Sequence, residues 1–257
     1  MPLLHSNIVG SGKPLFILHG FLGMGDNWKS LAINYVDAGY EVHLIDQRNH
    51  GRSFHSDDFS YDRMVSDLKV YADSKKIAQF DIIGHSMGGK TAMLFAVTYP
   101  EMINKLIVVD IAPKQYPQHH QDILKGLSSL DFNTIQNRND ADEQLKKYLS
   151  SMEIRQFLLK NLYRTEDNRF ALRINLPALI KNIEEVGKPL PAGSVFEGDT
   201  LYMSGERSGY IDEIDKTLLI PQHFPNADFV TIKNSGHWIH AENPREFFKA
   251  TIQFLSK

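Results

Sequence analysis

Six short apolar runs rich in β-branched residues constrain the fold of this chain more than any other feature of its sequence. They are bounded by glycine, aspartate or proline and cover residues 15–18, 42–45, 80–83, 106–109, 200–203 and 229–232. Runs of this kind are typical of parallel strands that are buried on both faces. Between them, apolar side chains recur at helical spacing over residues 30–36, 64–71, 91–97 and 247–255. The alternation predicts an α/β fold with a doubly wound, mostly parallel sheet.

The alternation stops over residues 114–196, where the sequence contains only apolar quartets at helical spacing. The quartets are Ile123/Leu124/Leu127/Leu130, Leu145/Tyr148/Leu149/Met152, Ile154/Phe157/Leu158/Leu162 and Leu176/Leu179/Ile180/Ile183. The segment interrupts the sheet before its penultimate strand, at the edge where open α/β sheets bind ligands. We therefore expect one domain over residues 1–257, with a core of residues 1–113 and 197–257 and a helical lid at 114–196. The alternative is a helical layer with no role at the binding edge.

The composition and charge of the chain exclude several other classes of protein. With 42% hydrophobic and 23% charged residues, the chain can bury a sizeable core and is neither disordered nor collagen-like. It has no cysteine, which excludes disulfides, thiolate nucleophiles and cysteine-based zinc sites. A net charge of -3 without a basic run argues against a nucleic-acid partner. No apolar stretch approaches the ~18 residues of a membrane span, and residues 1–12 do not resemble a signal peptide, so we expect a cytoplasmic protein.

The segment Gly84-His85-Ser86-Met87-Gly88 has the pattern of a nucleophile elbow. It follows one predicted strand and opens a predicted helix, which is the context that this turn requires. The glycines allow a tight, strained turn that would hold Ser86 Oγ out of the sheet, and the helix N-terminus would favour developing negative charge. Ser86 is therefore the candidate nucleophile. A glycine-rich turn without chemistry is the alternative.

Residues 18–23 read Leu-His-Gly-Phe-Leu-Gly and follow another predicted strand. A segment so rich in glycine can bring backbone N–H groups close to a substrate oxygen. We expect the N–H groups of Phe21 and Met87 to converge on an acyl oxyanion, because one such donor is often worth on the order of 3–4 kcal/mol in catalysis. A plain glycine-rich turn would have the same sequence.

Residues 234–238 read Asn-Ser-Gly-His-Trp and follow the last predicted strand. A glycine-assisted loop at this point can present the imidazole of His237 over the sheet edge to the nucleophile. Histidine titrates near neutral pH, which suits a general base. Position selects His237 from eleven histidines, since His19, His50 and His85 come too early in the order nucleophile, acid, base.

Two carboxylates are candidates for the acid that orients this histidine. Asp110 follows the strand at 106–109, so its side chain should lie at the carboxyl edge of the sheet. A charge there is costly unless it is paired, and a histidine that becomes cationic would supply the partner. Glu206 follows the next strand, where Arg207 offers an ordinary surface partner. We favour Asp110 and keep Glu206 as the alternative acid.

Taken together, these segments resemble the α/β-hydrolase-fold serine esterases, in family order and over almost the whole chain. More narrowly, residues 48–51 (Arg-Asn-His-Gly), 109–113 (Val-Asp-Ile-Ala-Pro) and 236–242 (Gly-His-Trp-Ile-His-Ala-Glu) resemble the YbfF-type esterases. This resemblance implies a helical cap and hydrolysis of acyl esters or thioesters. The usual family acid follows the strand after the cap, but residues 205–210 read Gly-Glu-Arg-Ser-Gly-Tyr without an aspartate. The departure favours Asp110, which matches the acid position of this branch.

The sequence therefore predicts a serine hydrolase that cleaves a small-molecule acyl ester or thioester through an acyl-enzyme on Ser86. The expected reaction needs no cofactor. His240 could pair with His237 as a metal ligand, but no His-Glu-x-x-His helix supports a metal site, and we expect none. A carbon–carbon bond hydrolase, a lactonase or a cofactor-free lyase on the same residues is one alternative, and a non-catalytic binding protein of the same fold is another.

In this interpretation the predicted lid determines which substrate is bound. Residues 114–189 hold twelve Lys or Arg and ten Asp or Glu, and this net charge of +2 is too small to indicate a phosphate-bearing group such as CoA. Met152, Phe157 and Leu158 could line an acyl pocket, although their helical spacing is more typical of packing. We expect a small or medium apolar acyl chain. The sequence does not indicate an oligomeric state.

Overall fold

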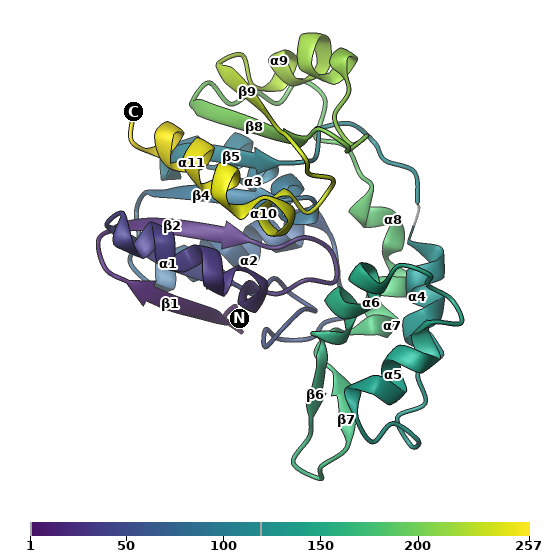
Figure 1. Ribbon diagram of the computed structural model, residues 1–257. Helices are drawn as coiled ribbons and strands as arrows, with labels where there is room; N and C mark the ends of the chain where they lie inside the picture. The colour runs from purple at the N-terminus through teal and green to yellow at the C-terminus, as the bar shows by residue number, and fades with distance from the viewer. Residues whose placement is uncertain (1, 119) are drawn as a thin grey trace.

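All six predicted strands occur in the computed structural model, which describes residues 2–118 and 120–257 (Figure 1). They belong to a seven-stranded sheet in the order β1-β3-β2-β4-β5-β8-β9. The strands are β1 (Ser6–Gly10), β2 (Lys13–Leu18), β3 (Tyr40–Ile45), β4 (Phe80–His85), β5 (Ile103–Val109), β8 (Asp199–Gly205) and β9 (Ala227–Ile232). Neighbouring strands are parallel except for β1 and β3, which are antiparallel. The predicted α/β fold with a mostly parallel sheet is confirmed.

The two edge strands differ from the sequence prediction. The apolar pattern does not predict β1, because Ile8 and Val9 are its only apolar residues besides glycine. It predicts β9 as a buried strand, and this is wrong, since Phe229 is 38% exposed and Ile232 is the one buried residue of the strand. The physical reason is position: β9 has a neighbour on one side only, so less of its surface is covered.

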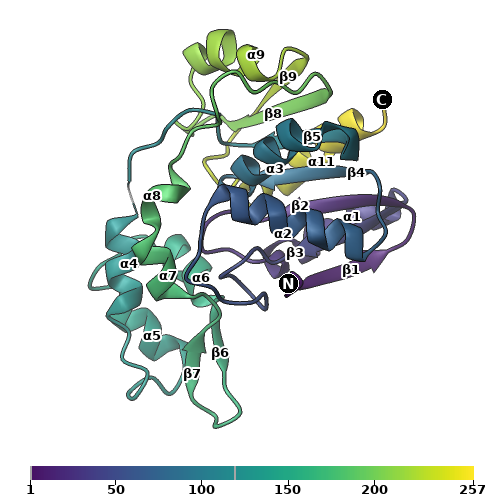
Figure 2. The same cartoon turned by 180° about the vertical axis from the view of Figure 1, so that it is seen from behind.

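Side chains alternate between the two faces of the sheet, and helices cover both faces. Leu15 and Ile17 of β2 belong to the apolar cluster that includes residues of α1 (Lys29–Asp37) and α11 (Pro244–Leu255). Phe16 and Leu18 of the same strand belong to the cluster that includes residues of α2 (Tyr61–Ser74) and α3 (Met87–Thr98), helices that Figure 2 shows from behind. The four helices predicted for the core are therefore confirmed, and the sheet is doubly wound.

Short helical turns complete the core. They are η1 (Gly25–Trp28), η2 (Pro100–Met102), η3 (Asp215–Leu219), α9 (Ile220–His223) and α10 (Ile239–Glu242). In the described part of the chain, we find no helix with the length and apolar character needed to cross a membrane.

The segment between β5 and β8 lies beyond the carboxyl ends of the parallel strands, beside the sheet (Figures 1 and 2). Its elements are α4 (Gln121–Ser128), α5 (Arg138–Leu145), α6 (Met152–Leu159), β6 (Leu162–Arg164), β7 (Phe170–Leu172), α7 (Leu176–Lys181) and α8 (Ile183–Val186). His119, within the same segment, lies outside the described residues. The segment is inserted at the edge of the sheet where the sequence predicts the site.

The described part of the insertion contains five helices, as a helical cap before the penultimate strand requires, but the helix predicted around Leu162 is wrong. An antiparallel hairpin of β6 and β7 replaces the helix predicted around Leu162, which pairs with Leu172. The turn of the hairpin places Asn168 at a φ of 60°, a left-handed conformation that asparagine tolerates better than most residues. The quartet that begins at Leu145 also does not form one helix, because α5 ends at Leu145 and α6 begins at Met152.

The insertion leaves and re-enters the core through two adjacent connecting chains. Residues 113–116 and 187–190 form two backbone hydrogen bonds with each other, of 2.8 and 2.9 Å. Lys90 on α3 is 1% exposed, and its Nζ donates to the carbonyls of both Lys114 and Lys188. Burial lowers the pKa of Lys90 to about 7. Because Lys90 bonds to both connecting chains, α3 holds both ends of the insertion. Lys90 lies one helical turn after the predicted elbow.

Candidate active site

Ser86 lies between β4 and α3 with φ 52° and ψ −117°, outside the regions that non-glycine residues favour. Glycines on both sides make this turn possible. A Cβ at Gly84 would lie 2.3 Å from Gly88 O, and a Cβ at Gly88 would lie 2.5 Å from Leu18 O. Ser86 N–H donates to Val109 O at 2.9 Å, which fixes the turn to β5. This is the geometry of a nucleophile elbow.

A cavity of about 280 Å³ is lined by both Ser86 and His237. The insertion contributes four apolar side chains to its wall: Ile123, Ile154, Phe157 and Leu158. Phe157 also packs against Trp238, with 5.6 Å between the ring centroids. Met152 is 60% exposed and does not line the cavity. Of the three side chains considered for an acyl pocket, the structure places two at the cavity and one at the surface.

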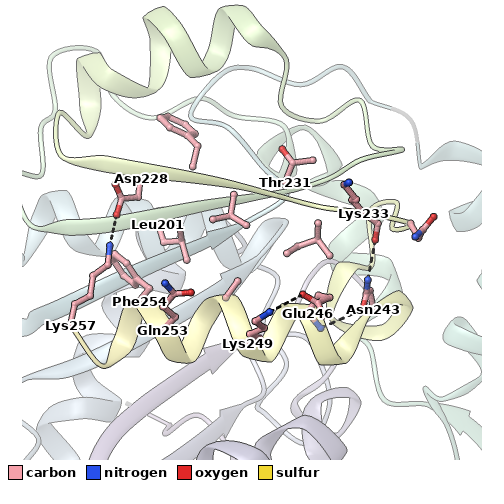
Figure 3. Close-up of a pocket in the computed structure, with 15 residues that line it drawn as sticks. Leu201, Asp228, Thr231, Lys233, Asn243, Glu246, Lys249, Gln253, Phe254 and Lys257 are labelled. Atoms are coloured by element: carbon pink, nitrogen blue, oxygen red, sulfur yellow. Dashed lines mark hydrogen bonds and ion pairs between the residues drawn. The ribbon is translucent and has the colours of Figure 1, made fainter.

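A larger groove, of about 670 Å³, lies between β9 and α11 (Figure 3). Charged side chains line it, and Lys257 forms an ion pair with Asp228 at 2.9 Å across its end. Neither Ser86 nor His237 belongs to its lining. The side chains predicted to carry chemistry therefore lie at the smaller cavity.

Asp110 and His237 form a close pair at the carboxyl edge of the sheet. Asp110 Oδ2 lies 2.7 Å from His237 Nδ1. The carboxylate is fully buried and also accepts hydrogen bonds from Gly205 N at 3.1 Å and from Ser208 Oγ at 2.5 Å. These partners offset the cost of burying a charge. With a carboxylate at Nδ1, the neutral imidazole carries its proton there and leaves the lone pair on Nε2.

Glu206, the alternative acid, has a different place in the structure. Its side chain is exposed, and Oε2 accepts a hydrogen bond from Asn234 N at 2.9 Å. Asn234 has a positive φ of 56° and begins the loop that carries His237. The structure therefore brings Asp110 to the imidazole, whereas Glu206 stabilises the loop on which the imidazole stands.

The loop of residues 20–23 approaches the elbow closely. A Cβ on Gly20 would lie 3.3 Å from Ser86 Cβ and 2.8 Å from His85 Nδ1, so glycine is required for this approach. Among the residues that the structure describes, the backbone N–H groups of Phe21 and Met87 donate to no protein acceptor. Two such backbone donors, in the segments that meet at Ser86, fit what an oxyanion hole requires.

Two buried, neutral histidines hold the same loop. His19 Nε2 accepts a hydrogen bond from Gln47 N at 3.0 Å, and its Nδ1 lies 2.8 Å from Gly20 O. His50 Nε2 accepts a hydrogen bond from Leu22 N at 3.1 Å. Burial lowers the pKa of His19 to about 4 and that of His50 to about 3. The order of the residues in the chain does not predict that His50 holds this loop. The one signal in the sequence is that His50 lies in residues 48–51, a segment that resembles the YbfF-type esterases.

Ser208 and Tyr210 contact the pair formed by Asp110 and His237, and the sequence patterns predict neither. Ser208 donates its hydroxyl to Asp110, and the Tyr210 ring stacks on His237 with 4.0 Å between centroids. Tyr210 is itself held through its carbonyl, which accepts a hydrogen bond from Tyr116 Oη at 2.5 Å. Both residues follow β8, in the loop where the usual family acid is missing. The signal in the sequence that could have indicated Ser208 is a polar residue in the loop where an acid is usual.

His240 stacks on Trp28, with 3.9 Å between ring centroids and 9° between ring planes. Burial lowers the pKa of His240 to about 3. In residues 2–118 and 120–257, no group of three or more His, Asp or Glu side chains is arranged to hold a metal ion. The structure thus gives His240 a packing contact beside the cavity.

The fold and the elbow agree with a known family. A family model described as the alpha/beta hydrolase fold matches residues 13–244. The chain belongs to the α/β-hydrolase-fold family.

Curated and solved relatives extend over nearly the whole chain. The sn-1-specific diacylglycerol lipase ABHD11 of Danio rerio is 37% identical over 255 residues, which cover 96% of this chain and 79% of the relative. Esterase YbfF of Escherichia coli is 30% identical over 96% of this chain and 94% of its own. A solved structure titled marine microorganism esterase superimposes with a TM-score of 0.95 at 41% identity, covering 99% of this chain and all of the other. The predicted resemblance to YbfF-type esterases is confirmed, and these relatives support a hydrolase.

Proposed function

We propose that this protein is a serine esterase that hydrolyses carboxylic esters and thioesters of small to medium apolar acyl groups. In this proposal Ser86 is the nucleophile, His237 the general base and acid, and Asp110 the residue that orients the imidazole. Phe21 and Met87 supply the oxyanion hole through their backbone N–H groups. The observation that carries the proposal is the 2.7 Å contact of Asp110 with His237, at a cavity that Ser86 also lines.

The first half of the reaction forms an acyl-enzyme. His237 Nε2 accepts the proton of Ser86 while Ser86 Oγ bonds to the acyl carbon, and the π electrons of the carbonyl move onto its oxygen. The N–H groups of Phe21 and Met87 stabilise that negative charge. When the carbonyl re-forms, the bond to the leaving oxygen or sulfur breaks, and His237 donates its proton to the departing alcohol or thiol.

The second half releases the acid. Water adds to the acyl carbon as His237 accepts a water proton, and a second oxyanion forms in the same hole. Its collapse breaks the bond to Ser86 Oγ, which recovers a proton from His237. Asp110 stabilises the imidazolium that exists briefly in each half. One water is consumed in the cycle.

The cavity supports apolar acyl groups of limited size. Its volume of about 280 Å³ is slightly below the range of roughly 300–1,000 Å³ that is typical of ligand pockets. Helices α4 and α6 provide four of its apolar side chains, so we include in the proposal a lid role for residues 114–196 over a core of 1–113 and 197–257 in one domain. Relatives named as an esterase and a diacylglycerol lipase support an ester substrate. We include thioesters among the proposed substrates because a thiol can leave from the same tetrahedral intermediate.

Covalent labelling and a substrate panel test the proposal. We expect a fluorophosphonate to label Ser86, and we expect p-nitrophenyl acetate and butyrate to be hydrolysed faster than the dodecanoate. Ser86→Ala should abolish labelling and lower kcat by roughly three to six orders of magnitude without lowering the melting temperature. Acyl-CoA thioesters and lactones complete the panel. Near-native turnover by Ser86→Ala, or turnover of lactones without any ester, would overturn the esterase assignment.

A further inference from the structure

Asn161, a residue of the insertion, contacts the loop that carries Phe21. It lies between α6 and β6 and is 0% exposed. Its Nδ2 donates to Leu22 O at 2.8 Å and to Leu158 O at 3.2 Å. The bond to Leu158 stays within the end of its own helix. The bond to Leu22 joins segments that are 139 residues apart in the sequence, and it links the insertion directly to the loop beside the nucleophile.

The backbone at Leu22 is in a conformation that its surroundings must hold. Its φ is 61°, in the left-handed region that a leucine rarely adopts. Leu22 N–H donates to His50 Nε2 at 3.1 Å, and Leu22 O accepts from Asn161. The core therefore fixes the peptide group before Leu22, and the insertion fixes the peptide group after it. The Phe21 N–H itself belongs to the peptide group between Gly20 and Phe21, whose carbonyl accepts a hydrogen bond from Gly23 N at 3.0 Å. The two contacts of Leu22 therefore act on the Phe21 N–H through the turn of residues 20–23, by holding the backbone between Phe21 and Gly23.

We propose that Asn161 is a positioning residue that sets the Phe21 N–H in the oxyanion hole, through Leu22, when the insertion is seated on the core. This inference rests on the proposed function, in which the Phe21 N–H stabilises the oxyanion. Such a donor works through its geometry, and a displacement of about 1 Å can cost roughly 100-fold in rate. Because the oxyanion exists in the transition state and not in the bound ester, loss of the Asn161 amide lowers kcat and leaves KM nearly unchanged.

Asn182 provides a matched control, because it makes the same kind of contacts at another place. Its Nδ2 donates to Asp57 O of the core at 3.1 Å and to Ala178 O of its own helix at 2.8 Å. It fastens the insertion to the core as Asn161 does, but away from residues 20–23. Asn161→Leu and Asn182→Leu each remove the amide and keep a similar volume. Asn161 is fully buried and Asn182 half-buried, so the two variants differ in stability. If Asn161 only fastened the insertion, the division of the effect between kcat and KM would be the same in both.

The experiment measures kcat, KM and inhibition by a trifluoromethyl ketone in the full chain, with p-nitrophenyl butyrate as the substrate. Ser86 Oγ adds to the ketone carbon, the serine proton passes to His237, and the carbonyl electrons become an oxyanion in the hole. Asn161→Leu should lower kcat about 10- to 100-fold and weaken inhibition by the ketone by a similar factor, whereas KM should stay within about twofold of the wild-type value. Asn182→Leu should leave all three values within about threefold.

A second variant keeps the test decisive if Asn161→Leu does not fold. Asn161→Ala has no group that can donate to Leu22 O, so it should show the same selective loss of kcat and of ketone affinity. Equal effects of the Asn161 and Asn182 variants, a change in KM without a change in kcat, or wild-type kcat in folded Asn161→Ala would each overturn the positioning role. Failure of the underlying function looks different, because the wild type would then escape fluorophosphonate labelling and Ser86→Ala would keep its activity.

Discussion

Asp110 at the end of β5 and His237 after β9 meet at 2.7 Å, although 127 residues separate them in the sequence. Strand β8 lies between β5 and β9 in the sheet, and the loop that follows β8 closes over the contact. Gly205 N at the end of β8 and Ser208 Oγ in that loop each donate a hydrogen bond to Asp110. In this chain the strand after the insertion therefore supplies hydrogen-bond donors to a carboxylate that comes from the strand before it.

The first prediction separates the two candidate acids. Asp110→Asn removes the charge that fixes the His237 tautomer, so kcat for an ester should fall by about 10⁴-fold. Glu206→Gln keeps an oxygen that can accept from Asn234, so its kcat should stay within about threefold of the wild type. Steady-state kinetics measures both, with circular dichroism as the check on folding. A larger loss in Glu206→Gln than in Asp110→Asn would reverse the assignment.

The second prediction concerns the hydroxyl of Ser208, which donates to Asp110. Ser208→Ala removes the 2.5 Å hydrogen bond to Asp110 Oδ2. Hydrogen bonds to charged groups contribute about 1.5–3 kcal/mol, so kcat/KM should fall roughly 10- to 100-fold. Ser74→Ala, which removes a hydroxyl bonded to Tyr71 O on α2, is the control. Unchanged kcat/KM in Ser208→Ala would show that Asp110 does not depend on this donor.

The third prediction tests the packing of the elbow. A Cβ at Gly88 would lie 2.5 Å from the backbone oxygen of Leu18, so Gly88→Ala forces the helix away from β2. Overpacking of this kind costs about 1–3 kcal/mol, which corresponds to a melting temperature lower by roughly 2–12 °C. Gly209→Ala is the matched substitution, because its Cβ would meet nothing within 4 Å. Equal melting temperatures for the two variants would contradict the close approach.

The fourth prediction is a pH dependence of stability that arises from His240. Burial lowers its pKa from 6.5 to about 3, so in acid the unfolded chain binds a proton that the folded chain does not. The contribution of neutral His240 to the free energy of unfolding is therefore complete above pH 6.5 and is lost as the pH falls from there toward 3. At pH 5 this one residue should contribute a slope of about 1.4 kcal/mol per pH unit.

His240→Phe isolates that contribution. Phenylalanine keeps an aromatic ring against Trp28, does not titrate, and replaces a buried Nδ1 that has no hydrogen-bond partner among the described residues. Urea unfolding at pH 7.5 and pH 5.0 should show that the variant loses less stability on acidification than the wild type. The exposed His55, changed to Gln, controls for the removal of an imidazole as such. The same loss in the wild type and His240→Phe would mean that His240 takes up its proton while folded.

Local sequence signals predicted most of the sheet and the elbow. The apolar runs located β2, β3, β4, β5, β8 and β9, because strands buried between helices need continuous apolar residues. The glycines around Ser86 predicted the turn, since its backbone leaves no space for other side chains. The same signals did not predict the hairpin of β6 and β7, whose short strands have no distinctive period. They also overestimated the burial of β9, because burial depends on neighbours and not on composition.

The sequence by itself determined which residue types stand at each strand end: a serine in an elbow, a histidine after the last strand, and two carboxylates that could serve it. Tertiary structure alone decided that Asp110 reaches His237 while Glu206 bonds to Asn234. It also decided that Asn161 bonds to the loop beside Ser86. A hydrogen bond requires two atoms within about 3 Å, and only the folded path of the chain brings atoms from distant segments so close.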